Sequence, residues 1–269
     1  MGEYQLLRMA RPGAAGLALL MIAGLAHAET PIEYLKGFCA AGERVPGTAG
    51  HRAAKDYIVK NLNNPAIDSF FERGAWFYNV SKSFGGKGRI IGIGAHWDSE
   101  KGSPGANDGG SGVALLLSLA DTLEKYAPDI GVELVFFDGE DIDEAELVGS
   151  LHYAAQCIEA FSFFLVVDMV GDKDLKLYKE GNSYKFFPEL VDSLWEIGAE
   201  TAPNIFSNEV RYYIKDDHMA LIRYGIRAVD VIDFDYSYWH TDDDTIDKCS
   251  AQSLDTMYKF LLKIVYPLY

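Results

Sequence analysis

Histidines and acidic side chains recur directly after short apolar runs of this 269-residue chain. One example is residues 94–120, GAHWDSEKGSPGANDGGSGVALLLSLA, where a histidine and two aspartates separate a strand-like run from an amphipathic helix. Two imidazoles and several carboxylates suit zinc, which accepts histidine nitrogen and carboxylate oxygen and can keep one position open for water. The residues of this kind are His96, Asp98, Asp108, Asp138, Glu140, Asp141, Asp168, Asp233 and His240.

A purely structural role would explain Asp108 but not Asp168. Asp108 precedes two glycines, as an ordinary turn former does. An ionised carboxylate beside a buried strand, such as Asp168 in the run LVVDMVG, is costly unless it is paired or metal-bound. A carboxylate between two cations can also bridge them, and metals ~3.5–4 Å apart can share a hydroxide nucleophile. Asp108 is the natural candidate for such a bridge.

The elements that would position these residues alternate along the chain. Near-continuous apolar runs at 89–95, 132–137, 161–167 and 226–232 predict strands of a sheet covered on both faces. Helical spacing predicts helices at 113–125, 50–62, 146–157, 187–201 and 253–266, and residues 171–183 are expected to form a long loop. This alternation predicts an α/β fold of three layers, with helices on both faces of a mixed, largely parallel sheet. Ligands bind such sheets at the carboxyl ends of the strands, where the polar residues collect.

Composition predicts one exported globular domain. Residues 1–28 combine a basic start, a short apolar run and the small-residue sequence Ala26-His27-Ala28, which together predict a signal peptide and a periplasmic or secreted protein. Residues 29–269 are then a single domain. The formal net charge of −16 disfavours nucleic acid and, once the signal is cleaved, membrane surfaces as partners. It favours cations, including metal ions and peptide amines.

The three cysteines, Cys39, Cys157 and Cys249, do not form a metal-binding or redox motif. In an oxidising compartment one pair could form a disulfide, and the sequence does not say which. The acidic run 242–244 is expected to precede or cap the last helix and to stay solvated.

An ordered series of motifs resembles the secreted di-zinc aminopeptidases, a family of zinc-dependent exopeptidases related to glutaminyl cyclase. The resemblance covers nearly all of the chain after the predicted signal. The motifs are GERVPGTAGHRAAKDYI, GAHWDS, SPGANDGGSGVALLLSLA, FFDGED, GSLHYA, DMVGDKDL, DDHMALIRYGI and YWHTDDDTIDKCS.

The resemblance implies a role for each site residue. His96 and Asp168 would bind one zinc ion and Asp141 and His240 a second, with Asp108 bridging the two; a single zinc is the alternative. Asp98 would orient His96 through its other ring nitrogen, and Glu140 would be the general base. The family commonly has glutamate where this chain has Asp141, so this ligand arm is one methylene shorter. The resemblance also implies a cis peptide bond after Asp108.

The expected function is that of a zinc aminopeptidase acting on peptides with a free N-terminus. The alternative is a glutaminyl cyclase, which forms N-terminal pyroglutamate at a single zinc. Asp216, His218 and Trp239 resemble the cyclase, and Asp216 and His218 are expected to support the site from behind the ligands. Against the cyclase, the segment after GED lacks the insertion of animal cyclases. A third interpretation, a non-catalytic binding domain, is disfavoured because all the expected ligand positions carry competent side chains.

In some secreted aminopeptidases a tyrosine precedes the last histidine and donates to the oxyanion. Here Trp239 occupies that position. The tyrosines left as candidates for this role are Tyr212, Tyr213, Tyr236 and Tyr238.

Overall fold

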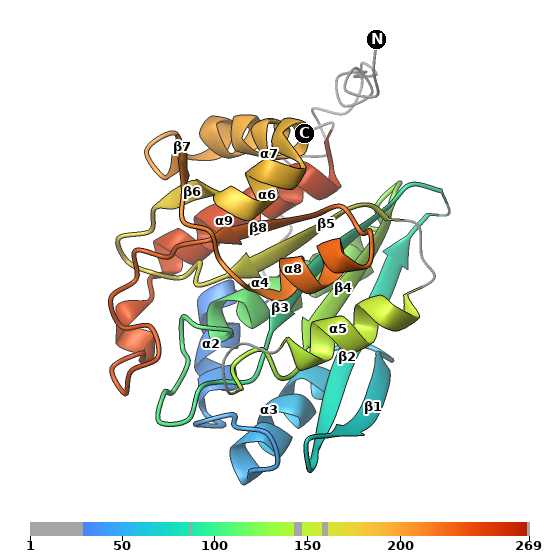
Figure 1. Ribbon diagram of the computed structural model, residues 1–269, viewed down its shortest axis with the longest axis vertical. Coiled ribbons are helices and arrows are strands. Elements are labelled where there is room, and N and C mark those ends of the chain that lie inside the picture. The colour runs from blue at the N-terminus through green and yellow to red at the C-terminus, as the bar shows by residue number, and fades with distance from the viewer. Residues whose placement is uncertain (1–28, 87, 143–146, 158–160, 268–269) are drawn as a thin grey trace.

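The computed structural model describes residues 29–86, 88–142, 147–157 and 161–267 (Figure 1). Its main sheet has six strands in the order β1-β2-β4-β3-β5-β8. Strands β4, β3, β5 and β8 are parallel, β2 pairs antiparallel with β4, and the edge strand β1 pairs antiparallel with β2. The bounds are β1 Ala66–Glu72, β2 Ala75–Gly85, β3 Ile90–His96, β4 Gly131–Phe137, β5 Phe161–Asp168 and β8 Ala228–Ile232. The mixed, largely parallel sheet confirms the predicted fold class.

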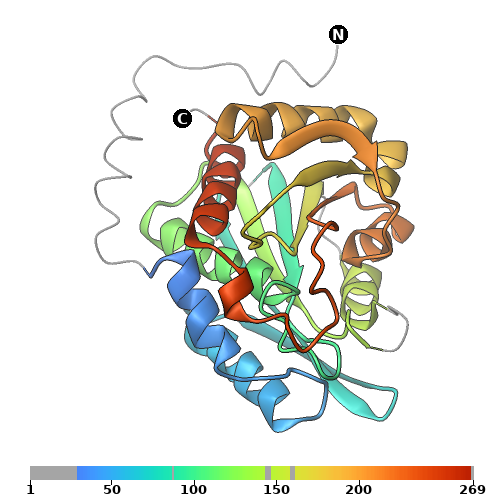
Figure 2. The ribbon, with the colours of Figure 1, turned by 90° about the vertical axis from the view of Figure 1, so that its left-hand side faces the viewer.

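Helices cover both faces of this sheet, as the two orthogonal views show (Figures 1 and 2). The larger core lies under α2 Pro31–Cys39, α3 Ala49–Lys60, α4 Gly110–Lys125, α7 Pro188–Thr201 and α9 Ala251–Val265. The smaller core on the opposite face lies under α5 Val148–Gln156 and α8 Asp217–Arg223. The three layers follow from strands whose two faces are both apolar.

The predicted strands and helices are confirmed, whereas the predicted loop at 171–183 is wrong. Each of the four predicted strands and five predicted helices overlaps an observed element. The predicted loop at 171–183 instead contains β6 Leu177–Glu180 and the start of α6 Gly181–Phe186. β6 is stabilised by pairing with β7 Phe206–Arg211, a partner about 30 residues away that local periodicity does not show. A short 3-10 helix, η2 Ile246–Lys248, precedes α9.

The predicted signal peptide lies outside the described residues. Among those that are described, no helix is long and apolar enough to cross a membrane. Cys39, Cys157 and Cys249 are free thiols.

Glycine lets α4 begin directly above the ends of β3 and β5. Gly109 has φ 69°, a conformation that costs glycine little. A Cβ at Gly112 would lie 2.5 Å from the carbonyl oxygen of Val167, so only glycine allows this close approach of helix and strand. The Asp108–Gly109 peptide bond is trans, which corrects the cis bond implied by the resemblance. The positive φ of Gly109 makes the turn into α4 with a trans bond.

Arg44 ties the N-terminal segment to the loop between β3 and α4. Its side chain is fully buried over the ring of Phe38. The guanidinium donates hydrogen bonds to five backbone carbonyls, those of Trp97 (2.6 Å), Asp98 (3.2 Å), Pro104 (2.6 Å), Gly105 (2.8 Å) and Asp108 (3.1 Å). Buried carbonyls need such donors, and a planar guanidinium offers five N–H groups in a fixed fan. Arg44 therefore fixes the backbone that carries Asp98 and Asp108.

We predict that Arg44→Met lowers the free energy of unfolding by about 3–5 kcal/mol, because it leaves buried carbonyls without donors. For a domain of this size the melting temperature would fall on the order of 10 °C. Arg44→Lys should be intermediate, since lysine keeps the charge but not the fan of donors. Arg52→Met, which removes an exposed arginine of the next helix with a single hydrogen bond to Gly47, is the control and should melt within about 2 °C of wild type. Equal melting temperatures for the Arg44 and Arg52 variants would contradict this role.

Candidate metal centre

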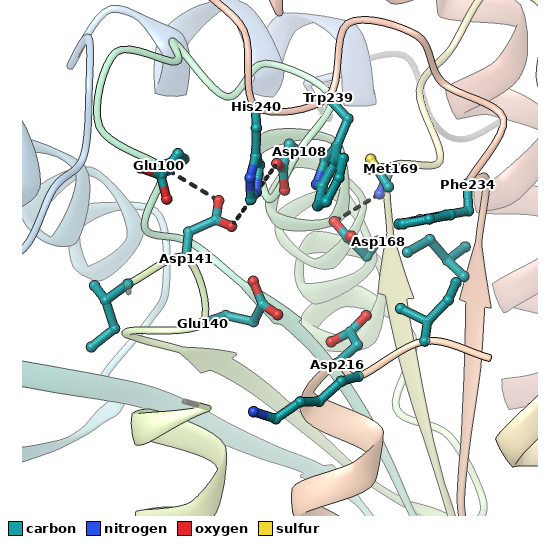
Figure 3. Close-up of a pocket in the computed structure, with 14 residues that line it drawn as sticks. Glu100, Asp108, Glu140, Asp141, Asp168, Met169, Asp216, Phe234, Trp239 and His240 are labelled. Atoms are coloured by element: carbon teal, nitrogen blue, oxygen red, sulfur yellow. Dashed lines mark hydrogen bonds and ion pairs between the residues drawn. The ribbon is translucent and has the colours of Figure 1, made fainter. Parts of the chain in front are cut away.

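The parallel strands deliver the predicted site residues to one edge of the sheet. β3 ends at His96 and β5 at Asp168, while β4 leads into the turn that carries Glu140 and Asp141. The two longer loops, after β3 and after β8, bring in Asp108 and His240. Figure 3 shows Asp108, Asp141, Asp168 and His240 converging from these separate elements.

The first group of potential ligands is His96, Asp108 and Asp168. His96 Nε2 lies 3.0 Å from Asp108 Oδ1 and 3.2 Å from Asp168 Oδ1. Zinc–ligand distances of about 2.0–2.2 Å in a tetrahedron place ligand atoms roughly 3.3 Å apart, close to these spacings. All three side chains are buried. One zinc ion therefore fits between them.

The second group is Asp108, Asp141 and His240. His240 Nε2 lies 2.9 Å from Asp141 Oδ1 and 3.5 Å from Asp108 Oδ2. Asp108 Oδ2 is buried and makes no hydrogen bond, while Oδ1 faces His96. The two oxygens of Asp108 thus point to different ligand groups, the arrangement that a bridging carboxylate requires. Although the side chain of Asp141 is one methylene shorter than that of glutamate, its carboxylate still contacts His240.

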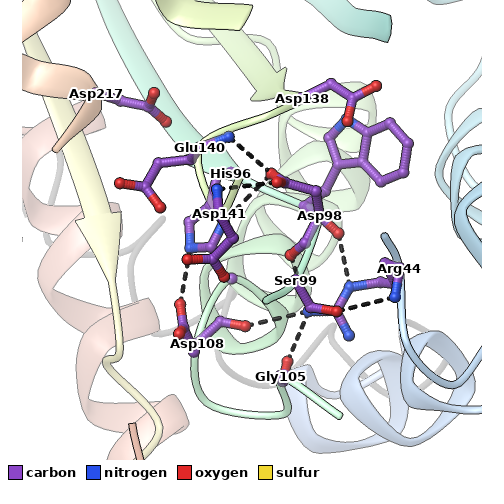
Figure 4. Close-up of polar contacts among 12 residues, drawn as sticks. Arg44, His96, Asp98, Ser99, Gly105, Asp108, Asp138, Glu140, Asp141 and Asp217 are labelled. Atoms are coloured by element: carbon purple, nitrogen blue, oxygen red, sulfur yellow. Dashed lines mark hydrogen bonds and ion pairs between the residues drawn. The ribbon is translucent and has the colours of Figure 1, made fainter. Parts of the chain in front are cut away.

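Asp98 lies behind His96 and holds the turn that carries Glu140 (Figure 4). Its Oδ1 is 3.6 Å from His96 Nδ1. Its two oxygens also accept hydrogen bonds from the backbone N–H groups of Glu140 (3.1 Å) and Asp141 (2.9 Å). Although burial opposes it, these contacts and His96 keep the pKa of Asp98 below its usual value. A carboxylate in this position fixes the ring orientation and tautomer of a metal-binding histidine.

The charges of the cluster call for cations. Burial, and then the carboxylate of Asp141, raise the pKa of Asp108 to about 8. Although burial lowers it, Asp168, Asp108 and Asp98 raise the pKa of His96 well above its usual value. Like charges held this close cannot all ionise unless positive charge balances them, and a bound divalent ion supplies that charge.

Glu140 faces the cavity beside the second ligand group. Burial, followed by the charge of Asp141, raises the pKa of Glu140 well above its usual value. A carboxyl group that changes protonation nearer neutral pH is suited to carry a proton during a reaction.

The cavity, of about 270 Å³, has an acidic floor and an apolar wall. Asp108, Asp141, Asp168 and His240 line it, whereas His96 does not. Its remaining lining residues are Glu100, Glu140, Ile142, Met169, Ile214, Lys215, Asp216, Ile232, Phe234 and Trp239. Trp239 stacks on His240 with ring centroids 4.1 Å apart.

The four candidate tyrosines do not line this cavity. Tyr236 donates to Asp244 at 2.6 Å, Tyr212 contacts Asp235, and Tyr213 is 71% exposed. The structure does not place a tyrosine hydroxyl where an oxyanion would form.

Asp244 is a site residue that sequence analysis missed. Instead of being solvated, it is fully buried and accepts hydrogen bonds from the backbone N–H groups of Asn107 (2.9 Å) and Asp108 (3.1 Å). The sequence predicted that Asp244 is exposed, because aspartates in an acidic run usually face solvent. Its place four residues after His240 puts it on the same returning loop, which was the available signal.

Asp216 and His218, predicted to lie behind the ligands, have different positions. Asp216 lines the cavity and lies near Asp168 (Figure 3). His218 contacts Glu180 and Asp230 instead of the catalytic cluster. It belongs to a separate buried group.

Comparison with known proteins gives relatives of two activities. The chain is 28% identical to aminopeptidase YwaD of Bacillus subtilis over 140 residues, 52% of this chain and about a quarter (26%) of that protein. A Zn-dependent exopeptidase from Parabacteroides distasonis superposes with a TM-score of 0.83 at 26% identity, covering 88% of this chain and 97% of the other. Tannerella forsythia glutaminyl cyclase superposes with a TM-score of 0.79 at 28% identity, again covering 88% and 97%.

These matches support zinc as the metal and leave the number of ions open. The model of peptidase family M28 matches residues 79–265. That stretch is well over half of the chain and includes both candidate ligand groups, so the protein belongs to peptidase family M28.

Proposed function

We propose that this protein is a zinc-dependent glutaminyl cyclase, which converts the N-terminal glutamine of a peptide into pyroglutamate and releases ammonia. The observation that carries the proposal is the make-up of the cavity. It combines one open ligand group, a proton-carrying carboxylate and an apolar wall, and it lacks a hydroxyl, phenol or thiol among its described lining residues. This lining offers no side-chain nucleophile, which fits a reaction in which the substrate's own amine, or water in the second candidate below, is the attacking group.

Zinc held by Asp108, Asp141 and His240 would polarise the γ-carboxamide carbonyl of the substrate. Glu140 takes a proton from the attacking α-amine as its nitrogen forms a bond to the γ-carbon. Glu140 then returns that proton to the amide nitrogen, which leaves as ammonia when the old carbon–nitrogen bond breaks. Asp216 and Glu100 add negative charge that attracts a substrate with a free amine.

The bacterial cyclase weakens the main objection drawn from the sequence. The segment after GED is short compared with animal cyclases, yet the T. forsythia enzyme superposes over 97% of its length. Trp239 in place of tyrosine and the DDH motif at 216–218 resemble the cyclase, but bacterial exopeptidases share both features, so they do not decide between the two activities.

Aminopeptidase activity is the second candidate, and a specific observation favours it. The two ligand groups share Asp108, so each of its oxygens can face a cation. With two metals the nucleophile would be water, and Glu140 would move its proton to the leaving amine. In either reaction the substrate is a peptide with a free N-terminus.

Assays of the zinc-loaded protein on glutaminyl peptides and on aminoacyl anilides separate the two activities. We expect loss of ammonia, 17 mass units by the arithmetic of the reaction, from a glutaminyl peptide of otherwise unchanged length, and little anilide cleavage. Release of free amino acids with no cyclised product would instead establish the aminopeptidase.

Glu140→Gln should lower kcat by about 10²–10⁴-fold, because glutamine cannot carry a proton. Zinc content, measured by elemental analysis, should stay at the wild-type value, because the groups of His96 with Asp108 and Asp168 and of His240 with Asp108 and Asp141 keep all their ligands, although Glu140 also lies near His96 and Asp141. Glu209→Gln, an exposed site on β7, serves as the control and should keep full turnover. Wild-type kcat in Glu140→Gln would exclude this mechanism.

Zinc should stabilise the protein more at pH 8 than at pH 5. In the metal-free protein the raised pKa values of Asp108, to about 8, and of His96 mean that the folded state binds more protons than the unfolded state. Stability contributed by these groups is present at low pH and is lost as pH rises toward 8. Zinc replaces those protons, so the zinc-induced rise in melting temperature should grow with pH. An equal rise at both values would show that zinc does not bind these side chains.

A further inference from the structure

A second buried polar cluster lies beside the catalytic residues, and apart from Asp216 its members are not used by the proposed reaction. It brings together Glu180 at the end of β6, Asp216, Asp217 and His218 at the start of α8, and Asp230 in β8. None of these side chains is more than 3% exposed. Four carboxylates thus surround a single imidazole in the protein interior.

Hydrogen bonds do not satisfy this cluster. Asp230 is fully buried, and both of its oxygens lack a hydrogen-bond donor. Oδ2 of Asp216 likewise lacks a donor, and neither nitrogen of His218 makes a hydrogen bond of normal geometry. A buried polar group without a partner costs about 1–3 kcal/mol, and charged groups cost more. So many in one place point to a ligand with several coordination positions.

His218 has the same surroundings as His96. Its Nε2 lies 3.3 Å from Glu180 Oε2, and its Nδ1 lies 3.6 Å from Asp230 Oδ2. Glu180 is held by backbone N–H groups of Asn182 (2.9 Å), Ser183 (2.6 Å) and Ile214 (2.9 Å). Glu180 can therefore fix the tautomer of His218 through Nε2, as Asp98 does for His96 through Nδ1. The other nitrogen of His218, Nδ1, then points to Asp230.

We propose that Asp216, His218 and Asp230 bind a divalent metal ion of the zinc class, at a site separate from both catalytic ligand groups. Potential ligand atoms of these three residues lie within 4.8 Å of one another. One imidazole and two carboxylates, without cysteine, suit zinc and its neighbours among the divalent metals. Asp216 also lines the catalytic cavity, which gives the ion a route into the site.

Charge supports a cation here. His218 is in ion-pair contact with Glu180 and with Asp230, so two buried carboxylates share one imidazole. Buried charges are normally paired with opposite charge or bound to a metal. At the start of α8, Asp216 borders the reaction cavity, and an ion bound behind it would join α8 to β8.

A crystal of the wild-type protein grown with zinc tests the site directly. Anomalous diffraction above and below the zinc edge should show a peak among Asp216, His218 and Asp230, apart from those in the catalytic centre. An anomalous peak that does not change across the zinc edge, or only water density at this position, would overturn the proposal.

Elemental analysis of variants gives a second test that is independent of activity. Asp230→Asn and His218→Gln should each bind one zinc equivalent less than wild type. His152→Ala, which removes a histidine paired with Asp68 near the surface, should keep the wild-type number. Wild-type zinc content in folded Asp230→Asn would contradict the proposal.

A background that lacks the catalytic ligands separates the two centres and protects the test against folding effects. The double variant His96→Ala/His240→Ala should retain one zinc equivalent, and adding Asp230→Asn should remove it. Circular dichroism verifies that each protein is folded. If the double variant binds no zinc while wild type does, all the metal belongs to the catalytic centre and this site is excluded, whatever reaction the enzyme performs.

Discussion

Mutual repulsion among buried carboxylates is the constraint on which this structure depends. The parallel strands end at one edge and deliver Asp108, Asp141 and Asp168 to positions a few ångströms apart, with two imidazoles between them. Without added positive charge some of these acids must hold protons, as the raised pKa of Asp108 shows. Cations bound between these side chains would balance this charge, so the metal would contribute to the stability of the fold as well as to the chemistry.

Holding such a cluster requires that the backbone around it cannot relax. Arg44 supplies donors to five carbonyls of the loop that leads to Asp108, and Asp244 accepts from the N–H groups of Asn107 and Asp108. Asp98 holds the turn of Glu140 in the same way. These buried groups neutralise backbone dipoles on both sides of the metal centre, which fixes ligand positions before any ion binds.

The sequence predicted the strands, the helices and most of the metal ligands, but it did not predict the buried side chains that hold the backbone around those ligands. Apolar runs and helical spacing identified the parallel strands and their covering helices, and the rule that strand ends gather ligands placed His96, Asp108, Asp141 and Asp168 together. Arg44, Asp244 and Asp230 act through contacts with segments distant in the chain, which leave no local periodicity. Acidic runs are read as solvated, so the burial of Asp244 was predicted wrongly, and β6 was missed because its pairing partner is remote. Motif order identified the family, whereas the choice between cyclisation and hydrolysis depends on which side chains line a cavity.

The two catalytic histidines are held very differently, and this difference decides where substrate can bind. His96 ends a central strand, is 1% exposed, and faces carboxylates on both ring nitrogens. His240 lies on a loop with φ 56°, its side chain 32% exposed, and is supported by stacking with Trp239. Asp108 and Asp168 of the His96 group still border the cavity, as do all three members of the His240 group. An ion in either group would therefore face the cavity through its carboxylates, while His96 holds its ion from the sheet and His240 from the solvent side. The strand-borne histidine fixes the position of the centre, and the loop-borne histidine leaves room beside Glu140 for a substrate.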